Sequence, residues 1–312
     1  MEISILLAEQ ILAMFLTMAV GFGVVRAGLF KTEDSRIISN MVVYICNPCV
    51  VVHSFQIELT DDKIKGLMIA IGLSVVVHMV LIIGSEILSF IFHFNSIEKA
   101  SIIYTNAGYL VIPLVGAVLG EEWVFYTTAF ILVQTVLMWT HGVKLIGQEK
   151  ELNIRKILCN PNVIAMIIGI ALFALEIRLP TVVDSCVSSF GDMISPASMM
   201  VIGMVIGDVD LKWVFRQKRP YLICLLRLIV FPLIAVVAFA GLERSGIHPD
   251  AEYILMIVLI ATSAPAAAMI TQLAQIYGKD SRYASVINVM SVIFCIITMP
   301  VMVLSYEMLI AL

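Results

Sequence analysis

Charged side chains are scarce in this sequence, and their scarcity is the first constraint on its class. Only 13% of the 312 residues are charged, whereas 61% are hydrophobic and the mean hydropathy is +1.04. Soluble domains carry roughly 25% charged residues, so the composition excludes a soluble globular protein and indicates an integral membrane protein. The basic residues are dispersed and form no patch interleaved with aromatics, so no nucleic-acid partner is expected.

Motifs for nucleotide binding and for hydrolysis are also missing. Neither GxGxxG nor GxxxxGKS/T occurs, which argues against transport powered by ATP within the chain. HExxH, GxSxG and paired intramembrane carboxylates do not occur either, which argues against a membrane-embedded enzyme. The six cysteines never cluster with His or acids at ligand spacing, so the sequence predicts no disulfide framework, no metal site and no cofactor.

Long apolar runs are abundant instead. A transmembrane helix needs about 20 mostly apolar residues, and ten stretches of about this length follow one another along the chain. They are Ile5–Val25, Ile38–Ile57, Gly66–Phe90, Ala100–Gly120, Val124–Ile146, Val163–Leu179, Val182–Ile206, Tyr221–Leu242, Ile254–Tyr277 and Tyr283–Ile310. The sequence therefore predicts an all-α polytopic membrane protein with ten transmembrane helices. No basic residue precedes the first stretch, so we expect it to be retained as a helix rather than cleaved as a signal peptide.

The distribution of Lys and Arg predicts the orientation, because basic residues near helix ends stay in the cytoplasm. The odd-numbered connections between stretches hold 14 of the 19 basic residues, whereas the even-numbered ones hold Lys63, Lys65, Arg178 and Arg244. Both termini are therefore expected outside the cytoplasm. The short connections and the lack of an N-x-S/T acceptor favour a bacterial inner membrane protein.

Matched prolines indicate an internal repeat. Pro48 and Pro196 lie 148 positions apart, and Pro113 and Pro265 lie 152 apart, so the first five stretches map onto the last five. Because five is odd, the second copy must cross the membrane in the opposite sense, which is the inverted-repeat plan of secondary transporters. The first copy, the cytoplasmic linker and the second copy are expected at 1–147, 148–160 and 161–312.

Pro113 and Pro265 each interrupt a long apolar stretch, the fourth and the ninth. If each takes the first position of a second half-helix, where its missing N–H costs nothing, two helix N-termini converge near the bilayer midplane. Such ends carry partial positive charge and unpaired donors, which suit a carboxylate. Asn106, Thr262 and Ser263 lie beside these interruptions and are expected to hydrogen-bond either the freed backbone or the ligand.

Further polar residues lie deep in other stretches. Asp192 is about 16 Å into the seventh stretch at 1.5 Å per residue, so it is expected either to carry a proton or to pair with a cation or a helix end. Arg227 either extends to the interface or attracts anions at the inner mouth. His78 is either a hydrogen-bonded core residue or a proton relay. Gln134 and Asn288 are expected to face the crossing from the fifth and tenth stretches.

Four short elements occur in order along the chain. They are Asn106 to Pro113, Gln134 to Trp139, Pro196 to Gly203 and Gln275 to Gly278. Together they resemble the auxin efflux carrier family of plants and bacteria, which includes bacterial malate and malonate permeases, and the resemblance covers essentially the whole chain. It implies that the fourth and ninth helices are broken and cross, and that a unit of helices 3–5 and 8–10 moves against helices 1, 2, 6 and 7. It also implies an organic carboxylate anion as cargo.

The sequence departs from the plant members of that family in two respects. The connection after the fifth stretch is short, and Val51 stands where some of them present a serine to the substrate. Auxin itself is therefore not the expected cargo. Asn47 and Val51 of the second stretch complete the set of expected substrate contacts. The full set is Asn47, Val51, Asn106, Pro113, Gln134, Thr262, Ser263, Pro265 and Asn288.

The sequence thus predicts a secondary transporter for small organic carboxylate anions, driven by the membrane potential or by protons. The resemblance implies that it works by an elevator-type mechanism. The expected partners are the anion and the lipid bilayer, with a homodimer as an option. A sodium-coupled carrier with the fold of bile-acid transporters and a non-transporting membrane sensor remain as alternatives.

Overall fold

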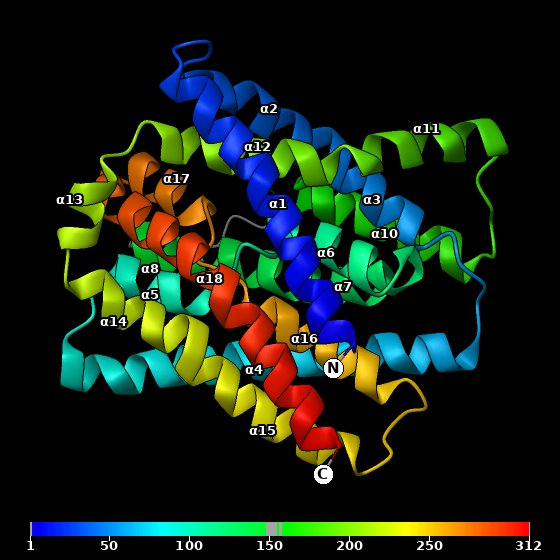
Figure 1. Cartoon of the computed structure of the whole chain (residues 1–312). Helices are drawn as coiled ribbons and strands as arrows, with labels where there is room; N and C mark the ends of the chain where they lie inside the picture. Colours follow the sequence, from blue (N-terminus) through cyan, green and yellow to red (C-terminus); the bar gives the residue numbers. More distant parts are fainter. Residues whose placement is uncertain (1, 148–154, 156–157, 312) are drawn as a thin grey trace.

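The protein is all-helical throughout the residues that the computed structural model describes, which are 2–147, 155 and 158–311 (Figure 1). The α-helices are α1 (Glu2–Arg26), α2 (Ser35–Met41), α3 (Asn47–Ser54), α4 (Asp61–Phe92), α5 (Ser96–Ile103), α6 (Ile112–Val118), α7 (Val124–Leu137), α8 (Val143–Gly147), α10 (Pro161–Ala174), α11 (Thr181–Asp192), α12 (Ile194–Gly207), α13 (Leu211–Arg216), α14 (Arg219–Leu225), α15 (Phe231–Glu243), α16 (Ala251–Ser263), α17 (Met269–Ile276) and α18 (Ser281–Ile310). The linker predicted at 148–160 lies largely outside the described residues.

Seven helical segments are long and apolar enough to cross a membrane. They are Ala8–Arg26, Thr32–Ser54, Asp61–Phe92, Glu121–Gly147, Thr181–Gly207, Arg219–Glu243 and Ser281–Ile310. Three shorter apolar helices, Ala107–Val118, Pro161–Ala174 and Ala251–Ser263, coincide with the fourth, sixth and ninth predicted stretches. The chain is therefore a multi-pass integral membrane protein. The fourth and ninth predicted stretches are interrupted in the structure, and the sixth forms a continuous helix that is shorter than predicted.

Proline explains the position of three π-helical turns in these segments. The turns Val42–Cys46, Ala107–Val111 and Leu226–Val230 each end two residues before a proline, namely Pro48, Pro113 and Pro232. Proline lacks an N–H and clashes with the carbonyl four residues earlier. A wider π-helical turn moves that carbonyl aside, so the segment continues past its proline as a helix.

The helices form two groups. In the first group, α1 packs along α12, and α3 packs on α10 and α11. In the second, α4 packs on α7 and α16, while α18 packs on α15, α16 and α17. The groups meet where α1 lies along α18 and α6, and Figure 1 shows α1 in dark blue crossing both α12 and the region of the interrupted helices.

Glycines permit the close packing of α1 on α12. A Cβ added to Gly203 would lie 2.0 Å from the carbonyl oxygen of Met18, and one added to Gly21 would lie 2.3 Å from that of Met200. The two backbones therefore touch where side chains are missing, as small residues allow in membrane helix pairs. This contact fixes α1 and α12 as one body.

Candidate functional site

Two interrupted helices cross at the centre of the molecule. The first is non-helical at residues 104–106, between α5 and the helical segment that begins at Ala107, and the second at residues 264–268, between α16 and α17. The two extended segments pair antiparallel through an isolated bridge between Thr105 and Ala266. Asn106 N–H donates to the Pro265 carbonyl at 2.8 Å, and Ala267 N–H donates to the Tyr104 carbonyl at 3.0 Å.

Side chains from the fifth and tenth predicted stretches hold the two central residues of the crossing. Gln134 accepts a hydrogen bond from Thr105 N–H at 2.8 Å and donates to the Thr105 carbonyl at 2.9 Å. Ser291 accepts from Ala266 N–H at 3.0 Å, and Asn288 donates to the Ala266 carbonyl at 2.6 Å. Each half of the chain thus satisfies the backbone groups that its own interruption frees, which a buried backbone requires.

The expectation that each proline begins a half-helix is wrong. Pro113 is the second residue of α6 and follows a π-helical turn, so the chain has been helical since Ala107. Pro265 lies within the extended segment, four residues before α17 begins. The interruptions arise at residues whose backbone pairs across the crossing. The prolines are accommodated in other ways, since Pro113 follows a π-helical turn and Pro265 lies where no N–H is needed.

Four helix ends nevertheless face the crossing. The segment from Ala107 and α17 begin there, and α5 and α16 end there. Helix N-termini carry unpaired N–H groups and partial positive charge, and C-termini carry unpaired carbonyls and partial negative charge. The crossing therefore has one pair of ends that suits an anion and one pair that suits a cation.

Asn106 presents a free donor at this point. Its side chain is only 5% exposed, and its Nδ2 has no hydrogen-bond partner among the described residues. The Ser263 hydroxyl is likewise buried without a partner, whereas the Thr262 hydroxyl is engaged by the Val258 carbonyl of its own helix at 2.7 Å. A buried donor without an acceptor costs about 1–3 kcal/mol, so Asn106 is the residue here best arranged for a ligand.

Asn47 of α3 approaches the same interrupted segment from the first group of helices. It is 4% exposed, its Oδ1 has no partner among the described residues, and its Nδ2 lies 3.3 Å from where a Cβ of Gly108 would be. The structure thus brings Asn47 close to the residues that follow Asn106. Val51, one turn further along α3, is buried at 1% exposure.

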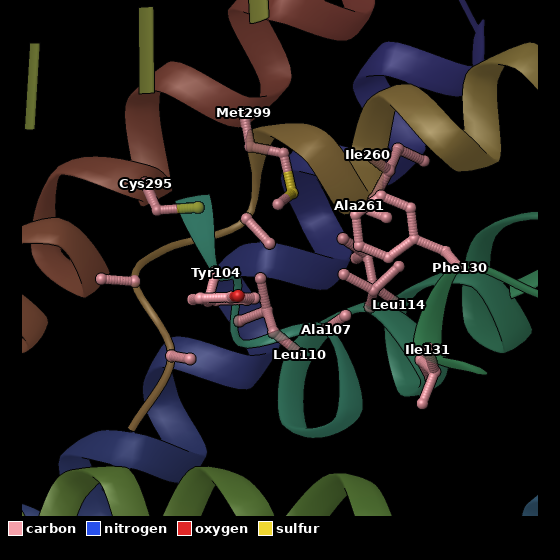
Figure 2. Packing of buried hydrophobic residues seen from close by; sticks show 14 of the residues in the cluster. Tyr104, Ala107, Leu110, Leu114, Phe130, Ile131, Ile260, Ala261, Cys295 and Met299 are labelled. Carbon is pink, nitrogen blue, oxygen red and sulfur yellow. The ribbon is translucent and has the colours of Figure 1, made fainter. Parts of the chain in front are cut away.

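A small apolar cavity of about 20 Å³ separates the two groups beside the crossing. Its lining residues are Ile11, Met14, Phe15, Met18, Leu110, Met199, Val292, Cys295 and Ile296. Figure 2 shows Leu110 and Cys295 among the buried side chains that surround the crossing. A cavity of this size holds a single water at most, so a carboxylate enters only if the two groups move apart. A larger cavity of about 330 Å³ lies between the end of α3 and the end of α10, lined by Phe55, Ile57, Glu58, Leu59, Leu172, Phe173, Glu176, Ile177 and Arg178, and contains none of the predicted site residues.

The two candidates for proton coupling, Asp192 and His78, lie in different surroundings. Asp192 is exposed at the end of α11, where the segment bends into α12, so the protein does not bury its carboxyl. The count along the stretch gave its depth, but the side of the helix that it occupies depends on packing. His78 is fully buried, and its Nδ1 lies 2.7 Å from the Ser74 carbonyl one turn earlier, as a core histidine would be.

Arg227 does not extend to the interface, which corrects that expectation. Its side chain is 0% exposed, and Nη1 donates to the Ile102 carbonyl in the last turn of α5 at 3.2 Å. Nε and Nη2 have no partner among the described residues. Arg227 lies in the π-helical turn Leu226–Val230, which ends two residues before Pro232.

One protein-family model matches both halves of the chain. The model of the membrane transport protein family, the auxin efflux carrier family, matches residues 6–154 and again residues 149–303. The chain belongs to this family. The resemblance stated from the sequence is thereby confirmed, and the protein is a transporter rather than an enzyme. The comparison with curated proteins found no match.

The short sequence motifs that resemble the family have structural roles in this protein. Gln134 holds the backbone of Thr105, and Gly203 allows α1 to touch α12. Gly278 follows α17 in the left-handed conformation at φ 62°, and Lys279 N–H bonds back to the Ala274 carbonyl at 2.8 Å. This is how a glycine ends a helix. These roles are structural, so the elements identify the family without identifying its cargo.

Sequence reasoning missed two features of this family member. One is Ser291, one turn beyond Asn288, whose spacing on the helix was the available signal. The other is Glu98, which is 2% exposed and accepts hydrogen bonds from Arg219 Nε at 2.8 Å and Tyr283 Oη at 2.7 Å. Burial raises the pKa of Glu98, but these bonds and one from Asn95 N–H outweigh burial and hold the pKa of the carboxyl below its ordinary value. The signal was the capping box formed by Asn95 and Glu98.

Proposed function

We propose that the protein is a secondary transporter for small organic carboxylate anions, and that the anion binds at the crossing. The observation that carries the proposal is the free, buried Nδ2 of Asn106 beside two helix N-termini. A carboxylate accepts hydrogen bonds only, so it matches a donor beside partial positive charge. The apolar cavity next to Leu110 supplies a surface for the rest of the cargo.

We further propose that the chain consists of two inverted copies of five transmembrane helices each. The antiparallel pairing of Thr105 and Ala266 supports a two-fold relation at the crossing. The side-chain hydrogen bonds to these two residues support it as well, because Gln134 bonds the backbone of Thr105 while Asn288 and Ser291 bond that of Ala266. The two matches of the family model to successive halves agree with it. Inverted repeats place their substrate at the repeat interface, near the bilayer midplane.

Transport then requires the two groups of helices to slide against each other. The group of α4 to α8 and α14 to α18 contains the crossing, and the group of α1 to α3 and α10 to α12 contains the glycine contact that holds α1 against α12. The Met-rich lining between them, with Met14, Met18 and Met199, is adaptable because methionine is flexible. We propose an elevator-type movement of the crossing, driven by the membrane potential, in a bacterial inner membrane.

Proteoliposome flux tests this function. Purified protein would be reconstituted with a panel of labelled mono- and dicarboxylates inside, and efflux would be followed at imposed potentials, with and without sodium and a pH gradient. The proposal expects saturable efflux of at least one carboxylate class that an inside-negative potential accelerates. Flux that strictly requires sodium would replace it with the sodium-coupled alternative, and no carboxylate flux under any condition would contradict it.

A further inference from the structure

We propose that Arg227 is a fixed cation of the moving unit, so that this unit is electrically neutral when loaded with a monovalent carboxylate and carries one positive charge when empty. The inference rests on the proposed function and adds to it the step on which the membrane potential acts.

Arg227 lies where two helix C-termini approach the crossing. It donates to the Ile102 carbonyl in the last turn of α5. The turn Leu226–Val230 that holds Arg227 also packs on α16, which ends at Ser263. In transporters with broken helices, C-terminal ends and unwound carbonyls are the places that hold a coupling cation. Here a side chain of the protein supplies positive charge at that place.

The depth of Arg227 places its charge within the membrane field. It lies eight residues beyond Arg219, where α14 begins, which is about 12 Å along a helix at 1.5 Å per residue. The hydrocarbon core is about 30 Å thick. The guanidinium is fully buried and remains charged, because arginine keeps its proton in proteins.

The charge of Arg227 is not cancelled by a neighbour. Among the described residues no carboxylate lies within ion-pair distance of it. The neighbouring charged side chains of the same group cancel one another, since Lys99 pairs with Glu86 at 2.9 Å and Arg219 pairs with Glu98 at 2.8 Å. The other buried carboxylate of this group among the described residues, Glu307, lies in the last turn of α18. The uncompensated charge that moves with the crossing is therefore that of Arg227 plus that of the cargo.

The sign of the voltage effect follows. A loaded unit carries the arginine and a monovalent anion and moves without doing electrical work. The empty unit returns to the cytoplasmic side with one positive charge, which an inside-negative potential favours. Each full cycle still exports one negative charge, but the potential acts on the return of the empty unit rather than on the movement of the cargo.

Comparing two transport modes of the unmodified protein separates these steps. Net efflux into cargo-free medium requires the empty return, whereas exchange with saturating cargo on both sides does not. One charge crossing 100 mV corresponds to about fifty-fold at equilibrium and about sevenfold in rate if the barrier is halfway. We expect net efflux to accelerate by up to about sevenfold per 100 mV inside negative, and exchange to stay constant within error. Exchange that depends on voltage as strongly as net efflux does would overturn the inference.

Variants of Arg227 test the assignment to this residue. In Arg227→Met the loaded unit carries the charge of the anion, so exchange should slow about three- to fourfold at 100 mV of either sign. Arg227→Lys keeps the charge and should keep the voltage-independent exchange of the parent. Equal voltage dependence of exchange in Arg227→Met and the parent would contradict the assignment. If Arg227→Met does not fold, comparing net efflux with exchange in the parent and in Arg227→Lys still tests the inference.

Failure of the inference is distinguishable from failure of the proposed function. A parent that transports a carboxylate without the difference between the two modes retains the function and loses the inference. A parent that carries no carboxylate in either mode loses both.

Discussion

The backbone N–H of Asn106 donates to the carbonyl of Pro265 at 2.8 Å, joining two residues that lie in different halves of the chain. This bond leaves the side-chain amide of Asn106 free at the crossing, with its Nδ2 buried and unpaired among the described residues. One residue therefore both builds the crossing and offers it a donor.

Replacing Gln134 should destabilise the protein. Gln134→Ala leaves the N–H and carbonyl of Thr105 without the side-chain amide that satisfies both, and each buried group left unpaired costs about 1–3 kcal/mol. We expect a clearly lower melting temperature in detergent. Gln272→Ala, at an exposed position of α17, is the control and should melt as the parent does. Equal melting of the two variants would show that Gln134 does not hold the crossing.

Two glycine substitutions should act in opposite directions. Gly203→Ala adds a Cβ at 2.0 Å from the Met18 carbonyl, which forces α1 away from α12 and should cost about 1–3 kcal/mol. Gly72→Ala lies in α4 with nothing within 4 Å, and it should be neutral or stabilising by up to about 1 kcal/mol because alanine favours helix. Thermal unfolding of both proteins checks the pair. A Gly203→Ala protein as stable as Gly72→Ala would contradict the close contact.

Glu98 should make stability depend on acid pH. Its pKa is held below the ordinary value of 4.5, so the carboxylate contributes stability above that value and loses it as pH falls through the folded pKa. We expect the melting temperature of the parent to fall below about pH 4.5, and that of Glu98→Gln to fall less steeply from a lower starting value. Glu122→Gln, at an exposed position, should follow the parent. If the melting temperatures of the parent and Glu98→Gln depended on pH in the same way, the acid sensitivity would come from another residue.

Both chain ends should face outside the cytoplasm, because the basic residues are concentrated in the odd-numbered connections. Fusing a reporter domain that is active on only one side of the membrane to each end checks this orientation. Cytoplasmic activity at both ends would invert the orientation. Activity on opposite sides would contradict an even number of crossings and with it the two copies of five.

The sequence predicted the class, the family and the location of the crossing because each depends on patterns along the chain. Apolar runs marked the helices, and the matched prolines marked the fourth and ninth stretches. Pro113 did not mark the first interruption, since it lies in a helix that follows a π-helical turn, whereas Pro265 lies within the second interruption. Cross-chain pairing between Thr105 and Ala266 determines where the helices stop, and no local pattern records it.

The sequence also did not predict which side of a helix each polar residue occupies. Asp192 and Arg227 are both charged residues within apolar stretches, yet one is exposed and the other is fully buried. Distance along a stretch predicts depth, but exposure depends on which neighbouring helices cover that side. Gln134 and Asn288 were placed correctly at the crossing because the repeat relates them, although their contacts are with the backbone.

Carboxylate binding by purified Asn106→Ala is the most direct test of the site. The bound carboxylate identified by flux would be titrated into the parent, Asn106→Ala and Asn40→Ala, which removes an exposed amide and serves as the control. We expect Asn106→Ala to lose about 1–3 kcal/mol of binding, or roughly 5- to 150-fold in Kd, with a melting temperature close to that of the parent. An Asn106→Ala protein that binds the anion as tightly as the parent and melts much earlier would show that Asn106 only builds the crossing, and that the cargo binds elsewhere.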